Sequence, residues 1–491
     1  MAIRRALFLT TSERYINIVL TLLTTVILSR LLGPAEMGVT VLGSSFLAIA
    51  EMIRELSVNN YLVQHKELTL DKTRSAFTIT LLISLAVSLL VFALGGALAD
   101  FYEVAGLKSY LHVVAFSFLL GPFIAPTNAL LRREMRFGAT TFAGLASAII
   151  GAVVAVWLAW HGFSYMSFAW SSLASAASLA ALTVYFRPDF SIFRPSLGSW
   201  RSVVAFGALD TTSNILYAIG HDLPYLIFGR MLNAESVGLF QRATMLSYLP
   251  SRILFSGIAP ITLPLLSDIA RKGEDLRKTL FSILDYITVL QWPALALLAL
   301  FAHPVVLVLL GERWMAAVPI VQIISVARLV SLPTGLVNSV LIATGSVRRS
   351  LMVNAVSVPF TIAVMSLAAM HGLEAVALSL LITIPFHLMV SLINVRTVIP
   401  FGWLELANAV RGNVVVTMTT IIGPVLVMAI NGHGFAVPVP VAIGCLAIAI
   451  GGWLLGLSLV QHPLLTELRR ASDAAADVIS AWRLKRQQSK P

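Results

Sequence analysis

Charged side chains lie inside several of the most apolar stretches of this 491-residue chain, and they are the residues best suited to chemistry. An ionisable group in the hydrocarbon core of a membrane is costly, so each one is a candidate functional residue. Arginine is the majority type, and its planar guanidinium binds phosphate and carboxylate groups in a bidentate manner. The candidates for a cationic substrate site are Arg14, Arg54, Arg242, Arg252 and Arg328.

Carboxylates inside apolar runs are candidates for a coupling proton or cation. Asp210 and Asp222 share one such run, and Glu51 precedes Arg54 by three residues in another. Because residues three apart share a helix face, Glu51 and Arg54 are also expected to form an internal ion pair. For Arg14, near the start of the first run, the alternative is a side chain that snorkels to the membrane surface.

Repeated apolar runs must position these side chains. The chain is 58% hydrophobic and only 12% charged, which is more apolar than a soluble domain requires. Runs of about 20 residues are long enough to cross a bilayer as helices. We expect fourteen spans near 13–32, 37–57, 76–98, 108–130, 139–160, 163–186, 202–229, 237–258, 280–310, 315–344, 350–370, 373–395, 411–430 and 435–460, with a break in the ninth at His303-Pro304.

The net charge of +11 is distributed by loop. Basic residues gather in alternate loops: Arg4 and Arg5; Lys66, Lys72 and Arg74; Arg132, Arg133 and Arg136; Arg187, Arg194 and Arg201; Arg271, Lys272, Arg277 and Lys278; Arg348 and Arg349; Arg396 and Arg411. The positive-inside rule therefore predicts that both termini are cytoplasmic. Topology explains the positive charge better than a nucleic-acid partner, and we expect none.

The chain also repeats a short sequence after 200 residues. Ser29–Val39 aligns without a gap to Gly229–Leu239, and in both copies an apolar run ends on Arg-X-Leu, a polar turn follows and a new run begins. A weaker match pairs 159–163 with 369–373. Each repeat holds six spans, an even number, so the two lobes should share one orientation about an axis along the membrane normal.

These patterns predict an all-α polytopic membrane protein of about fourteen helices. Its expected parts are an N-lobe at 1–186, a cytoplasmic linker at 187–201, a C-lobe at 202–396, two extra helices at 397–460 and a basic amphipathic tail at 461–491. The tail is expected to lie on the anionic inner leaflet.

Several kinds of chemistry lack their sequence motifs. The chain has no Gly-x-x-x-x-Gly-Lys phosphate loop, no His-Glu-x-x-His and no Gly-x-Ser-x-Gly, and its one cysteine is Cys445. The nine histidines are scattered. We therefore expect a transporter and not an enzyme, with no catalytic residues, no metal and no cofactor.

Short stretches resemble a known membrane protein family. Leu-Ser-Arg-Leu-Leu-Gly-Pro-Ala-Glu-Met-Gly at 28–38 looks like the signature that follows the first helix of polysaccharide flippases. Similar landmarks follow in order: Gly238 to Phe240 with Pro260 and Pro264 to Ser267, Leu310 to Trp314, Ala343 to Gly345, and His371 to Ala375. Over about residues 1–400 the chain resembles flippases of the multidrug/oligosaccharidyl-lipid/polysaccharide exporter superfamily.

The resemblance implies two six-helix lobes in a V, alternating access, and transfer of an undecaprenyl-pyrophosphate-linked oligosaccharide from the cytoplasmic to the periplasmic leaflet of a bacterial inner membrane. Lipid II flippases carry arginines on helices one, two and eight, where Arg14, Arg54 and Arg252 lie here. The expected partners are this lipid-linked substrate and membrane lipids. A polysaccharide polymerase and export machinery are further candidates.

Other interpretations stay open. A lipid II flippase shares the same features. A cation-coupled multidrug antiporter of the superfamily would have a lumen dominated by carboxylates, and this chain lacks the Asp that many such exporters carry early in helix one. A membrane-embedded polymerase would call for a large outer loop, and a scaffold would recruit glycosyltransferases through the tail.

Overall fold

The computed structural model describes residues 2–55, 61–63, 68–331, 334–432, 434–470 and 473. In these ranges the backbone forms helices joined by turns, as the all-α prediction requires; most of the predicted tail lies outside them. The helices of the N-lobe are α1 (Ala2–Leu31), α2 (Pro34–Glu55), α4 (Leu70–Tyr102), α5 (Ala105–Phe118), α6 (Gly121–Arg133), α7 (Phe137–Trp160) and α8 (Met166–Phe186).

The second group begins after the short 3-10 helix η1 (Phe190–Phe193). The helices of the C-lobe are α9 (Trp200–Met231), α10 (Ala234–Lys272), α11 (Leu276–Leu300), α12 (Ala302–Leu309), η2 (Glu312–Ala317), α13 (Val318–Leu329), α14 (Thr334–Ala343), α15 (Val347–Ala369) and α16 (Leu373–Arg396). Two further helices, α17 (Trp403–Asn431) and α18 (Val439–Val460), pack on each other, and α17 packs on α11.

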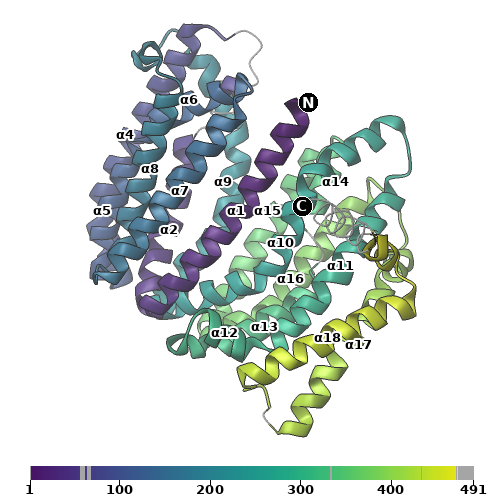
Figure 1. Ribbon diagram of the computed structural model, residues 1–491. Helices are drawn as coiled ribbons and strands as arrows, with labels where there is room; N and C mark the ends of the chain where they lie inside the picture. The colour runs from purple at the N-terminus through teal and green to yellow at the C-terminus, as the bar shows by residue number, and fades with distance from the viewer. Residues whose placement is uncertain are drawn as a thin grey trace, which may run out of the picture.

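The two lobes stand side by side and come together at one end. In Figure 1 the N-lobe is purple to blue, the C-lobe is teal to green, and they meet at the lower end, where α1 ends close to α12. We call this the contact end and the opposite one the far end. Between the lobes, α2 packs against both α9 and α10. The repeat helices α2, α9 and α10 therefore form much of the contact between the lobes, and α4 of the N-lobe also packs on α9.

The helices agree with a membrane-spanning fold. Ten described helices are long and apolar enough to cross a membrane, and α5 with α6, bent by 43°, makes an eleventh candidate. The predicted spans at 202–229, 237–258 and 315–344 fall on α9, on α10 and on α13 with α14. The ninth span breaks at Phe301, two residues before the predicted site. α1 begins at Ala2, well before residue 13.

The repeated turn is built with different side chains in its two copies. In the first copy, the carboxylate of Glu36 accepts a hydrogen bond from the backbone N–H of Gly33 at 2.7 Å. In the second, the side-chain oxygen of Asn233 accepts one from the backbone N–H of Ser236, also at 2.7 Å. Each bond satisfies an N–H that the start of a helix leaves without a partner. Both turns thereby bring their helix pairs to the contact end.

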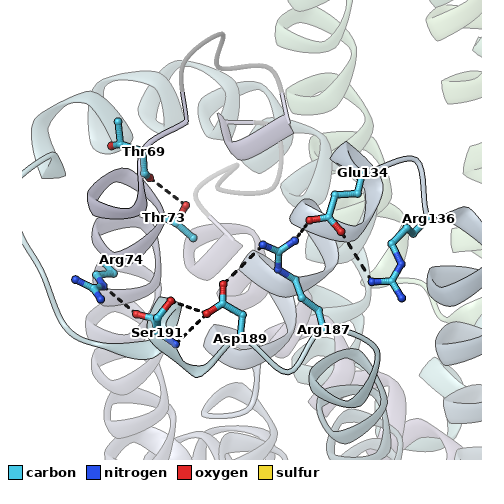
Figure 2. A network of polar contacts seen from close by, with 8 residues as sticks. All are labelled: Thr69, Thr73, Arg74, Glu134, Arg136, Arg187, Asp189 and Ser191. Carbon is cyan, nitrogen blue, oxygen red and sulfur yellow. Dashed lines mark hydrogen bonds and ion pairs between the residues drawn. The ribbon is translucent and has the colours of Figure 1, made fainter.

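The linker between the lobes is bonded to the N-lobe at the far end (Figure 2). Arg187, just after α8, forms ion pairs with Glu134 and Asp189. Hydrogen bonds from Ser191 hold the pKa of the Asp189 carboxyl below its ordinary value. On α4, Arg74 donates from Nε to the Ser191 carbonyl at 2.8 Å. The first part of the linker is thus bonded to the N-lobe before α9 begins.

Candidate functional site

The candidate arginines lie at different depths along helices of both lobes. With a rise of 1.5 Å per residue, Arg14 lies about 25 Å along α1 and Arg54 about 30 Å along α2 from the helix ends at the contact end. By the same measure Arg252 on α10 lies about 27 Å from that end, Arg328 on α13 about 15 Å, and Arg242 on α10 about 12 Å. Positive groups therefore occur at several levels between the contact end and the middle of the bundle.

Arg54 is largely buried and its guanidinium has several contacts. Its side chain is 10% exposed, and its Nε donates to Oε2 of Glu51 at 2.9 Å, so the predicted ion pair on α2 is present. The guanidinium carbon lies 5.9 Å from the ring centre of Phe118. A Cβ added at Gly121 would overlap the guanidinium. The bend between α5 and α6 therefore supplies both the aromatic ring and the space for the arginine head.

Arg14 projects from a helix that is anchored by the neighbouring residue. Glu13 accepts a hydrogen bond from Thr141 on α7 at 2.7 Å, which fixes the rotation of α1 against the N-lobe. Arg14 is exposed. In a membrane protein an exposed arginine at this depth faces either lipid or a water-filled space between helices.

Arg328 on α13 contacts residues of α10 that neighbour Arg252. Arg328 is 6% exposed, stacks 3.4 Å from the ring centre of Tyr248, and donates from Nη2 to Ser251 at 3.2 Å. Tyr248 and Arg252 are both exposed and stand four residues apart, on one face of α10. Arg328 therefore packs against the ring of Tyr248. Arg252 lies on the same face of α10 as Tyr248, one turn closer to the far end.

Arg242 lies within the contact between the lobes. It is 7% exposed; its Nη2 lies 3.0 Å from the sulfur of Met37 on α2, and its Nη1 lies 3.5 Å from the sulfur of Met245. The ring centre of Trp314 is 6.0 Å away. In this structure the side chain is packed between the lobes and does not line an open lumen, so its proposed contact with substrate requires the lobes to move.

The carboxylates have separate environments. Asp222 on α9 is partly buried, and the side chain of Asp210 lies outside the described residues. Asp285 on α11 is bonded to Asn413 on α17 at 2.9 Å and to His462 at 2.9 Å. It therefore fastens the two extra helices to the C-lobe. The coupling roles of Asp210, Asp222 and Glu51 remain predictions.

Reciprocal bonds join the lobes at the contact end. The indole N–H of Trp314 in η2 donates to the Ser29 carbonyl on α1 at 2.7 Å. Arg30, at the end of α1, donates to the Val308 carbonyl on α12. Arg230, its counterpart at the end of α9, pairs with Glu103 of the N-lobe at 3.5 Å. Both repeat arginines thus reach into the opposite lobe.

Some uncharged residues that were not predicted as site residues also shape these environments. Tyr248 carries no charge, yet it stacks on Arg328 and shares a helix face with Arg252. Its position four residues before Arg252 is the signal that could have identified it. Gly121 and Phe118 had no such signal, because they meet Arg54 only through the packing of α5 and α6 on α2.

Three comparisons place the chain among known proteins. The family model described as "Polysaccharide biosynthesis protein" matches residues 27–319. The chain is 24% identical to an uncharacterized membrane protein in the cps region of Klebsiella pneumoniae, over 74% of this chain and 76% of that protein. It is 23% identical to the lipopolysaccharide biosynthesis protein WzxC of Escherichia coli K12, over 67% of each.

The fold has a solved counterpart. The structure described as lipid II flippase MurJ in an inward closed conformation superposes with a TM-score of 0.73 at 12% identity, covering 94% of this chain and 99% of that one. At this identity the likeness concerns the fold alone. The family match, which spans more than half of the sequence, identifies the chain as a member of the polysaccharide biosynthesis protein family.

Proposed function

We propose that the protein is a flippase that moves an undecaprenyl-pyrophosphate-linked oligosaccharide repeat unit from the cytoplasmic to the periplasmic leaflet, for exopolysaccharide, capsule or O-antigen synthesis. The arginines would bind the pyrophosphate, because guanidinium groups bind phosphate oxygens in a bidentate manner. The sugars would lie between the lobes and the lipid tail would stay in the bilayer. Family membership and the named relatives support this assignment.

The observation that carries the proposal is the placement of arginine on both lobes at one level. Arg14 and Arg54 belong to the N-lobe and Arg252 to the C-lobe, and all three lie about 25–30 Å along their helices from the contact end. A pyrophosphate bound between them would interact with both lobes at once. Its binding could therefore be coupled to their relative motion.

The proposed moving bodies are residues 1–186 and 202–396, with 187–201 as their connection and 397–460 as additional helices. The loop charges support cytoplasmic termini, a contact end on the periplasmic side and an inner-membrane location. In this orientation the structure corresponds to a state closed towards the periplasm. A polysaccharide polymerase and export machinery are the proposed downstream partners.

Three of the described carboxylates give the antiporter alternative little support. Glu51 is paired with Arg54, Glu13 accepts a bond from Thr141, and Asp285 accepts one from Asn413. A carboxylate already engaged by a guanidinium, a hydroxyl or an amide is poorly placed to bind a transported cation.

The test is the orientation of lipid-linked sugar in spheroplasts of a deletion strain. The strain would be complemented with wild type, with R54A plus R252A, or with the charge-preserving R54K plus R252K. R271A is the matched control, because Arg271 lies on α10 as Arg252 does but is 77% exposed and pairs with Asp268. Expression and membrane insertion are compared by immunoblot.

We expect the deletion to leave the lipid-linked saccharide on the cytoplasmic face, with wild type and R271A restoring transfer. The double alanine variant should not restore it, and the double lysine variant should restore it in part. Normal transfer in the deletion strain, with redundant transporters also removed, would contradict the flippase assignment.

A further inference from the structure

Arg242 is a buried cation whose hydrogen-bonding capacity is largely unused. Its hydrogen-bond contacts are the sulfurs of Met37 and Met245, which are weak acceptors, its Nε has no hydrogen-bond partner, and the ring centre of Trp314 lies 6.0 Å away. Among the described side chains, no carboxylate forms an ion pair with it. A guanidinium removed from water without a counter-ion is strongly disfavoured, so this arrangement opposes closure of the contact.

The repeat supplies an internal comparison. With its offset of 200 residues, Arg242 on α10 corresponds to Leu42 on α2, just as Gly238 corresponds to Gly38. Leu42 is fully buried and packs on Gly229 of the opposite lobe. The structure therefore tolerates an ordinary apolar residue at this place in one copy of the repeat. Packing does not explain why the other copy carries a charge.

The position of Arg242 links this charge to the motion of the lobes. Met37 belongs to the N-lobe, whereas Arg242 and Met245 belong to the C-lobe, so separating the lobes at the contact end removes the Met37 contact and exposes the guanidinium. Arg242 lies four residues after Gly238, whose backbone packs on Pro34 and Gly38 of the N-lobe, and it is nearer to the contact end than the other candidates.

We propose that Arg242 is a state-dependent anion site: it is unavailable while the contact end is closed and binds the phosphate group of the substrate once the lobes part there. This inference rests on the proposed function and extends it. The cost of burying the charge favours separation, and a bound phosphate stabilises the separated state because only that state admits it. The Arg242 site thus lies towards the contact end, where substrate would be released, whereas Arg14, Arg54 and Arg252 lie further towards the far end.

The experiment measures opening of the contact directly. Val237 is fully buried there, so a cysteine at this position reports separation of the lobes through its rate of reaction with a maleimide. V237C is placed in a C445S background, since Cys445 is the one native cysteine. The purified protein in detergent is labelled alone and with farnesyl pyrophosphate, farnesol or inorganic pyrophosphate. The added variants are R242M, R242L, R242K and the control R271M.

We expect farnesyl pyrophosphate to raise the labelling rate several-fold in the V237C protein, and farnesol to have no effect. R242M should lower the basal rate about fivefold or more and abolish the response, R242K should keep the response, and R271M should behave as the parent. R242L, which places the residue type of Leu42 at 242, gives a second apolar variant in case R242M does not fold, as judged by size exclusion. An effect of pyrophosphate alone would identify a site for the free anion, whereas a need for the lipid chain would identify the lipid-linked form.

Equal basal rates and equal responses in the arginine, methionine and leucine proteins would overturn the inference, and so would the absence of any response to either phosphate in the parent. These readouts use purified protein and no saccharide. Failure of the flippase assignment in spheroplasts is therefore distinguishable from failure of the Arg242 site.

Discussion

Gly238 packs directly on Gly38 where the two lobes meet, and the two glycines occupy the same place in the repeat. A Cβ built on Gly238 would lie 3.0 Å from the amide nitrogen of Gly38 and would overlap the carbonyl oxygen of Pro34. A Cβ on Gly38 would overlap the carbonyl of Ala234. Backbone meets backbone at this point, which only residues without a side chain allow.

Alanine at either glycine should prevent this contact from closing. The overlapping atoms belong to the backbone, so the clash cannot be relieved by a rotamer change and the lobes must separate. We expect G38A and G238A to increase maleimide labelling of V237C about tenfold or more and to abolish transport. G96A is the control, because Gly96 is also helical and has open space around its Cβ position. Wild-type labelling in G38A would show that the lobes do not meet as described.

Gly121 offers a way to displace Arg54 without changing a charge. In G121A the new methyl group would meet the guanidinium, which is the far end of a flexible side chain and can move aside. We therefore expect transport to fall at least about tenfold, while the midpoint of thermal unfolding changes little. The measurement is saccharide orientation in spheroplasts together with unfolding of the purified protein. Full transport in G121A would mean that the position of Arg54 is unimportant.

The hydrogen bond of Trp314 should stabilise the state in which the lobes are in contact at the contact end. W314F removes the 2.7 Å hydrogen bond to Ser29 and leaves that buried carbonyl without its donor, a loss of about 1–2 kcal/mol. The closed form should be disfavoured by about 5- to 30-fold relative to the open form. Faster labelling of V237C, without loss of folded protein on size exclusion, is the expected result. An unchanged labelling rate would assign the bond to stability of the fold alone.

Asp71, in the first turn of α4, anchors the linker. Its carboxylate accepts hydrogen bonds from Ser196 at 2.5 Å and Ser199 at 2.7 Å. D71A should loosen this segment and speed chymotrypsin cleavage at Leu197, which is 54% exposed. The control is D268A, because Asp268 pairs only locally along α10, with Lys272 at 2.6 Å. Equal cleavage in D71A and wild type would place the restraint on the linker in other bonds.

Much of the fold follows from local sequence. Apolar runs specify helices that cross a bilayer, and the His303-Pro304 pair predicts the break at Phe301 to within two residues. The ion pair of Glu51 with Arg54 was predictable because three-residue spacing puts both on one helix face. In each case the interacting groups lie close together in the chain.

The sequence by itself determined the helical architecture, the repeat and the set of intramembrane charges, because hydropathy and spacing act within single helices. Only the tertiary structure decided which charges are engaged. Arg242 looked like a lumen residue, yet it is buried against Met37, a residue 205 positions away. Such a contact depends on how two lobes pack, and packing combines many long-range contacts that no local pattern encodes.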